Sequence, residues 1–183
     1  MKNTGVLILL LSLMIAASQQ AEAQGRSEIA LSFGGGSLQA NTGGGATIVF
    51  SCSYRFHITQ HVSVEGALDT FNYNIAADAP ENSSIFRDDY LGAEAAIVYH
   101  FLPNRDTGRL LPFVAVGIGK TTTDFTEIAA HPYYRLGAGV NYHLTDRLGF
   151  QLEVRDEIIK KLWTHGEPNG NLPSIRGGIV IRF

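Results

Sequence analysis

A strict alternation of apolar and polar side chains runs from Tyr134 to Asp156 and limits the folds open to this chain. In residues 134–144 every second side chain is apolar or aromatic, and the residues between are two glycines, an arginine, an asparagine and a histidine. After a turn at residues 145–147 the alternation resumes, with the apolar set at Leu148, Phe150, Leu152 and Val154 and the other set at Gly149, Gln151, Glu153 and Arg155. Because successive side chains of a strand point to opposite faces, this stretch predicts an antiparallel hairpin.

The N-terminus has the order of a secretory signal peptide. Lys2 precedes an apolar run over residues 6–17, and a small-residue cleavage sequence follows at residues 21–23. The run is shorter than the ~20 residues of a spanning helix, which argues against a membrane anchor. We therefore expect residues 1–23 to be removed and residues 24–183 to form one domain.

The same period of two recurs along the rest of the mature chain. The further segments with this pattern are 28–34, 46–57, 62–73, 89–101, 111–120 and 174–183. Together with the hairpin they predict an all-β fold of eight strands. The first, third, fifth and seventh links are long or rich in glycine, at Gly35–Gly45, Asn74–Arg87, Thr121–His131 and Glu157–Pro173. The glycine triplets at 34–36 and 43–45 are interpreted as flexible turns.

The arrangement of long and short links is typical of an antiparallel up-and-down barrel. In such a meander the odd-numbered links all emerge at one end and the even-numbered links at the other. Transmembrane β-barrels of the bacterial outer membrane have this organisation, with an even strand number and long loops at the external end. We therefore predict an eight-stranded transmembrane β-barrel.

A soluble ligand-holding barrel would have the same alternation with its apolar face inside, so composition must separate the two. Charged residues are 17% of the chain, and the polar face is largely Gly, Ala, Ser and Asn, which is too little charge for a face in water. The polar face is therefore expected inside, and the apolar face toward lipid. The predicted interior ionic network is Glu65, Glu94, Arg135, Glu153, Arg155 and Arg176, whose opposite charges can neutralise one another.

Several segments resemble a known family. Ile179-Val180-Ile181-Arg182-Phe183 is similar to the C-terminal strand that outer-membrane proteins present to the barrel assembly machinery. The stretches LLPFVAVGIG (110–119) and YRLGAGVNYHLTDRLGFQLEVRDE (134–157) resemble the fifth to seventh strands of small OmpA/OmpX-type barrels. The resemblance implies an outer-membrane location, an Arg/Glu network that includes Glu153 and Arg155, and Phe183 as an assembly signal. With the chain ending at Phe183, no peptidoglycan-binding domain is expected after the barrel.

Three histidines recur on the inner face at the short-turn ends of predicted strands: His57, His100 and His143. The two interpretations are a shared metal site and separate interfacial or pore-mouth histidines. At a strand spacing of ~4.8 Å, alternate strands lie about 10 Å apart, whereas zinc requires nitrogens at ~2 Å. We therefore predict no metal site, and the sequence indicates no cofactor.

The favoured function is a structural or loop-mediated interaction role for a barrel with a plugged polar interior. The alternative is an outer-membrane acyl hydrolase or transferase that uses Ser83 or Ser84 with His131 or His165, although no spacing singles out a nucleophile. A small-solute channel is less favoured.

The expected partners follow from this reading. They are outer-membrane lipid, the barrel assembly machinery and an unidentified partner of the loops. The net charge of −3 does not favour nucleic acid, and we expect a monomer.

Overall fold

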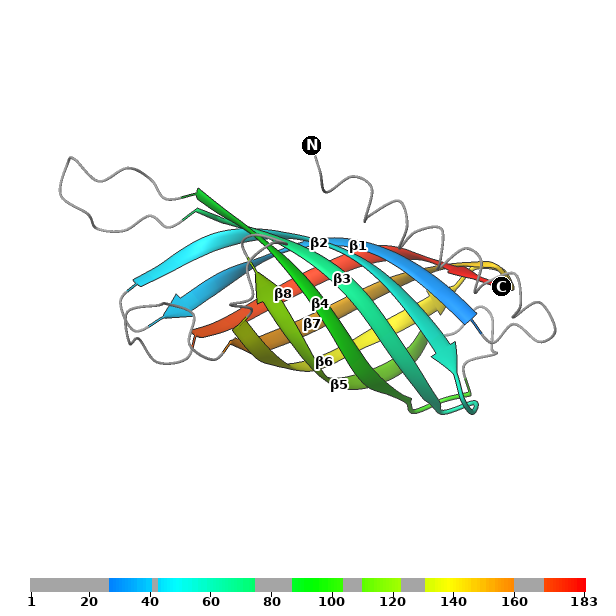
Figure 1. Cartoon of the computed structure of the whole chain (residues 1–183). Coiled ribbons are helices and arrows are strands. Elements are labelled where there is room, and N and C mark those ends of the chain that lie inside the picture. The colour runs from blue at the N-terminus through cyan, green and yellow to red at the C-terminus, as the bar shows by residue number, and fades with distance from the viewer. Residues whose placement is uncertain (1–26, 41–42, 75–86, 104–109, 123–130, 160–169) are drawn as a thin grey trace, which may run out of the picture.

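The structure, a computed structural model, describes residues 27–40, 43–74, 87–103, 110–122, 131–159 and 170–183. These residues form a closed barrel of eight antiparallel strands in chain order, in which the last strand pairs with the first (Figure 1). The strands are β1 (Ser27–Ala40), β2 (Gly43–His57), β3 (Val62–Asn74), β4 (Arg87–His100), β5 (Leu110–Thr122), β6 (His131–His143), β7 (Leu148–Ile159) and β8 (Gly170–Arg182). The predicted fold class is confirmed.

The predicted signal peptide, residues 1–23, lies outside the described residues and stays a prediction. Within them there is no helix that is long and apolar enough to cross a membrane.

Most of the large apolar side chains of the described residues lie on the outside of the barrel, and most of the charged side chains lie inside. Ile118 on β5 is 64% exposed, whereas Arg135, which is on the neighbouring strand β6, is 1% exposed. This distribution is the reverse of that in a soluble protein. The two faces follow from the period of two, because each strand places its apolar set on one face and its polar set on the other. An exposed apolar wall of this kind fits hydrocarbon, and the closed sheet leaves no unpaired edge.

The glycine triplets do not form the flexible turns that the sequence predicted. Residues 34–36 lie within β1 and residues 43–45 within β2, where they pair with neighbouring strands. The physical reason is clearest at Gly34, where a Cβ atom would collide with the carbonyl oxygen of Ile175 on β8. Glycine therefore permits a close approach at the seam that closes the barrel.

The strands are longer than the sequence pattern indicated. The link predicted at 157–173 is shorter, because β7 continues to Ile159 and β8 begins at Gly170. One end of the barrel, the long-loop end, carries the links at 41–42, 75–86, 123–130 and 160–169. The opposite, short-turn end carries the links at 58–61, 101–109 and 144–147, and Phe183 also lies there (Figure 1).

A small apolar cluster lies inside the barrel toward the short-turn end. It consists of Val98, Phe113 and Ala115, all buried. Phe113 occupies space that Gly139 on β6 leaves, since a Cβ there would lie 2.7 Å from the Phe113 ring. The guanidinium of Arg55 stacks 5.2 Å from the centre of the same ring. This cluster therefore packs against the short-turn side of the charged interior, through Arg55.

Candidate functional site

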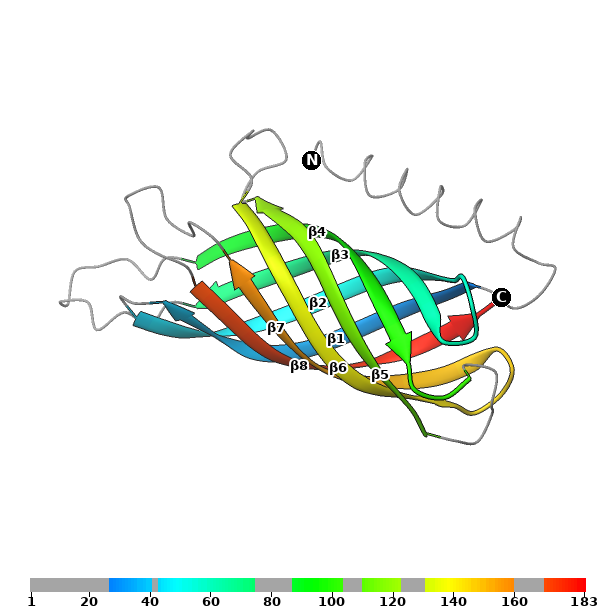
Figure 2. The same ribbon diagram turned by 90° about the horizontal axis from the view of Figure 1, so that it is seen from below.

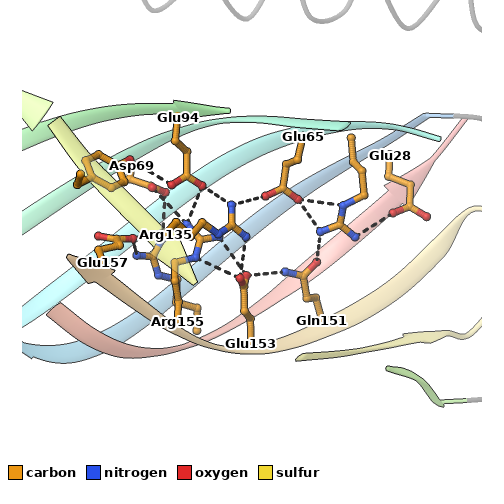
Figure 3. A network of polar contacts seen from close by, with 12 residues as sticks. Glu28, Glu65, Asp69, Glu94, Arg135, Gln151, Glu153, Arg155 and Glu157 are labelled. Atoms are coloured by element: carbon orange, nitrogen blue, oxygen red, sulfur yellow. Dashed lines mark hydrogen bonds and ion pairs between the residues drawn. The ribbon is translucent and has the colours of Figure 1, made fainter. Parts of the chain in front are cut away.

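A column of charged side chains fills the described part of the barrel interior (Figure 3). All of its members point inward from the strands and are buried. The carboxylates are Glu28, Glu65, Asp69, Glu94, Glu153 and Glu157, and the guanidiniums are Arg55, Arg135, Arg155, Arg176 and Arg182. Burying so many charges is tolerable only if each is paired and hydrogen-bonded, so the geometry of the pairs decides what the interior can do.

Arg135 on β6 holds the centre of the column. One of its terminal nitrogens donates to Glu65 at 2.6 Å and also to Glu94, and the other donates to Glu153 at 2.7 Å. These carboxylates come from β3, β4 and β7, so a single side chain links four strands across the interior (Figure 3). A planar guanidinium with several fixed donors suits this role better than an ammonium group.

Arg155 on β7 extends the network toward the long-loop end. It donates to Glu153 and Glu94, each at 3.0 Å, and to Asp69 at 3.3 Å. Two of these carboxylates, Glu94 and Glu153, also accept hydrogen bonds from Arg135, so the two guanidiniums are linked through shared acids. The phenol of Tyr133 donates to Glu94 at 3.1 Å and completes that carboxylate's contacts.

Arg176 on β8 closes the column at its long-loop side. It donates to Asp69 at 3.1 Å, to the hydroxyl of Ser174 at 3.2 Å and to Glu157. Its guanidinium also lies 5.8 Å from the centre of the Phe71 ring. The arginine is thus held on several sides at once, which fixes its position in the barrel.

Toward the short-turn end the column continues through Arg55 on β2. Arg55 donates to Glu65 from two nitrogens, at 2.9 and 2.5 Å, and to Gln151 at 3.4 Å. Glu28 comes next, 3.5 Å from Arg55 and 3.2 Å from Arg182. Charge pairing therefore extends along the barrel axis, from Glu157 to Arg182.

The histidines lie closer together than the strand spacing predicted. The hydroxyl of Ser63 is 2.5 Å from Nδ1 of His57 and 3.1 Å from Nε2 of His100, and the two ring centres are 5.4 Å apart. The two rings are closer than the spacing of about 10 Å expected between alternate strands, because inward side chains of a small closed barrel converge. His143 points into the same region, with Nε2 3.9 Å from Glu28.

The described residues contain one group whose ligand atoms lie close enough to share a metal ion: Asp69, Glu94 and Glu157. Each of these carboxylates already faces one or more arginines, Arg176 and Arg155 among them. Their geometry is therefore that of ion pairs.

The structure brings together all six residues of the predicted network: Glu65, Glu94, Arg135, Glu153, Arg155 and Arg176. The interior also contains residues that the prediction left out. They are Glu28, Arg55, Asp69, Gln151, Glu157 and Arg182. Strand parity was the signal that could have found them, since Arg55, Asp69, Gln151 and Arg182 alternate with outward apolar residues. Glu157 is missing from the predicted network because the sequence pattern places it in the link after the strand, whereas β7 continues to Ile159.

The residues considered for catalysis cannot be placed as a site. Ser83, Ser84 and His165 lie outside the described residues, and only the backbone of His131, at the start of β6, is described. The structure therefore gives no geometry for a nucleophile and base.

An apolar outer wall, a closed eight-stranded sheet and an ion-paired interior together define a small transmembrane β-barrel. The chain belongs to the outer membrane protein β-barrel domain family, whose model matches residues 6–183. It is thus a protein of the bacterial outer membrane, as predicted. No curated protein matches the sequence.

Solved structures of outer-membrane barrels are similar to this one. Neisserial surface protein A (NspA) aligns with a TM-score of 0.64 at 17% identity, over 87% of this chain and 98% of its own. OprG from Pseudomonas aeruginosa has a TM-score of 0.59 at 11% identity, over 86% and 96%. Ail from Yersinia pestis has a TM-score of 0.53 at 12% identity, over 86% and 98%. At these identities the likeness concerns the fold.

Proposed function

We propose that this protein is a closed outer-membrane barrel that does not pass solutes and that acts through its long-loop end. The barrel serves as a membrane anchor with a plugged polar interior. The links at 75–86, 123–130 and 160–169 then provide the surface for an interaction partner outside the cell. Outer-membrane lipid and the barrel assembly machinery are its other expected partners, and it acts as a monomer.

The observation that carries this proposal is the way in which Arg135 spans the interior. An eight-stranded barrel has room inside for little more than its own side chains. Arg135 crosses that space and is held by Glu65 and Glu153 at 2.6 and 2.7 Å. A solute would have to break several buried ion pairs at once to pass, and breaking even one is costly.

The other two functions have less support. A small-solute channel requires a water-lined path, whereas the described interior consists of paired charges in direct contact. The lipid-modifying enzyme rests on residues such as Ser83 and His165, for which the structure gives no geometry. The closed barrel is therefore the function that the described residues support best.

A liposome-swelling experiment tests the proposal. The purified barrel would be reconstituted into phospholipid liposomes, which are then diluted into isotonic solutions of arabinose and of raffinose. We expect the liposomes to swell no faster than protein-free liposomes, while liposomes with a general porin swell in both sugars. Swelling of liposomes with the unmutated barrel in arabinose would contradict the proposal and show that the protein is a channel.

A further inference from the structure

A bridge of hydrogen bonds crosses the short-turn end of the barrel interior through two histidines. At this end the turn that joins β2 to β3 lies beside the end of β4, where the main-chain N–H of His100 donates to the carbonyl of His61 at 2.7 Å (Figure 2). Inside the barrel, the hydroxyl of Ser63 on β3 lies between the rings of His57 on β2 and His100 on β4. Nε2 of His57 is 3.1 Å from the carboxylate of Glu28 on β1. These four side chains, the histidine bridge, therefore link four neighbouring strands at the end that faces the periplasm in barrels of this class.

The direction of each hydrogen bond in the histidine bridge follows from the chemistry of its members. A carboxylate only accepts, so Nε2 of His57 donates to Glu28, and Nδ1 of a neutral His57 accepts. Ser63 donates its single proton to that Nδ1, at 2.5 Å, and accepts from Nε2 of His100 at 3.1 Å. Nδ1 of His100 then carries no proton, and it has no hydrogen-bond partner among the described residues. The bridge is complete with both rings neutral.

The histidine bridge leaves His100 no place for a second proton. The side chain of His100 is fully buried, and a proton added to Nδ1 would be a buried donor that has no acceptor among the described residues. If Ser63 donated to His100 instead, the added proton would go to Nε2 and displace the Ser63 hydroxyl. In both arrangements a protonated His100 is incompatible with the histidine bridge.

The groups around His100 do not provide a carboxylate for a charge on its ring. The charged and titratable residues described at this end are Glu28 on β1, Arg55 and His57 on β2, His61 in the following turn, Glu65 on β3, His143 on β6 and Arg182 on β8. Glu28 already lies 3.2 Å from Arg182, and Glu65 already lies 2.6 Å from Arg135. On β5 the neighbour is the apolar ring of Phe113, whose centre is 6.1 Å from that of His100. A charge on His100 would therefore stay uncompensated.

We propose that the histidine bridge is an acid-sensitive latch on the periplasmic end of the barrel. At neutral pH it links β1, β2, β3 and β4, and in acid the protonation of His100 releases Ser63 and loosens this end. The opened end binds one more proton than the closed end, so the equilibrium constant for opening rises as the pH falls. Below ~6.5, where an ordinary histidine takes up its second proton, the rise is about tenfold per pH unit. The latch does not depend on the interaction role of the long loops.

Hydrogen–deuterium exchange of the folded barrel in phospholipid vesicles tests this proposal. The protection of main-chain amides would be measured from about pH 7.5 to about pH 5 and corrected for the intrinsic pH dependence of amide exchange. We expect protection in residues 57–63 and 98–101 to fall by about tenfold per pH unit below ~6.5, while residues 114–118 in the middle of β5 keep theirs. An equal loss in all three segments would show global unfolding and contradict a local latch.

Two variants show whether His100 is the group that takes up the proton. His100→Gln should lose the pH dependence, because glutamine can donate to Ser63 but does not titrate in this range. His61→Gln is the matched control, since His61 is a partly exposed histidine of the adjacent turn outside the histidine bridge, and it should keep the pH dependence. The pH series of the unmutated barrel tests the latch even if His100→Gln does not fold. Constant protection in the unmutated barrel, or the same pH dependence in His100→Gln, would overturn the proposal.

Discussion

Glu153 lies between two arginines from different strands, with Arg135 at 2.7 Å and Arg155 at 3.0 Å. Glu153→Ala would leave both guanidiniums buried with one carboxylate fewer. Removing one partner of a buried pair typically costs about 3–5 kcal/mol. We expect the free energy of unfolding, measured by urea titration in phospholipid vesicles, to fall by about that amount.

The control for this substitution is Asp146→Ala, which removes the same charge from the exposed turn between β6 and β7. Exposed ion pairs contribute little, so this variant should unfold at almost the same urea concentration as the unmutated protein. Equal destabilisation by the two variants would contradict the importance of the buried pairs.

The outer wall gives a second prediction at the residue scale. Leu152 is 53% exposed on the lipid-facing side of β7, away from both ends of the strand. Leu152→Arg should cost about 2–4 kcal/mol, because an arginine near the bilayer midplane is poorly solvated. Leu148→Arg places the same charge on the same face at the first residue of β7, where the cost falls to about 0–1 kcal/mol. Similar costs at both positions in a refolding titration would contradict the assigned lipid-facing side.

At the scale of the element, the seam between β1 and β8 closes the barrel. A Cβ at Gly34 would collide with the Ile175 carbonyl, whereas a Cβ at Gly177, in the same strand pair, would meet nothing within 4 Å. We expect Gly34→Ala to lower the free energy of unfolding by about 1–3 kcal/mol, as overpacking does, and Gly177→Ala to leave it nearly unchanged. The comparison uses urea titration of both variants, and an equal effect would show that the seam tolerates a side chain at either position.

The end of β8 carries the predicted assembly signal. The Phe183 main-chain N–H donates to the carbonyl of Ser27 at 2.9 Å, and its side chain is 39% exposed. Deletion of Phe183 should lower the amount of folded barrel in outer-membrane fractions and increase its degradation in the periplasm, with synthesis unchanged. Phe183→Tyr, which keeps an aromatic end, should behave like the unmutated protein. Normal folded levels after the deletion would show that assembly uses another signal.

How much of each element could be predicted depended on which physical signal the sequence carries. Strand number and the inward and outward faces followed from the period of two, as in Arg135 and Leu136 on β6. Strand ends did not, because Gly35 and Glu157 extend strands through pairing with neighbours that a local pattern does not reveal. Because the sequence pattern ends the strand before Glu157, the predicted network does not include this residue. Distances such as that between His57 and His100 depend on how side chains converge across the interior, which parity alone does not give.

At the scale of the whole molecule, one apolar wall surrounds one continuous column of ion pairs. The column passes from Arg182 and Glu28 near the short-turn end, through Arg135, to Arg176 and Glu157 on the long-loop side. Every strand contributes to the barrel wall, and β1, β2, β3, β4, β6, β7 and β8 contribute charges to the column. A molecule built in this way presents lipid with an apolar outer surface, and under the proposed function its interior gives solutes no free path.

Electrical recording in planar lipid bilayers tests this closed interior most directly. The folded barrel would be inserted from detergent into a bilayer in concentrated potassium chloride, with insertion confirmed by recovery of the protein from the membrane. We predict no sustained current from the unmutated barrel. Because the ion pair of Arg135 and Glu94 spans the interior, the double variant Arg135→Ala with Glu94→Ala should show current openings that the unmutated barrel lacks. A steady conductance on the order of a nanosiemens from the unmutated barrel, as expected of a water-filled pore, would contradict the account.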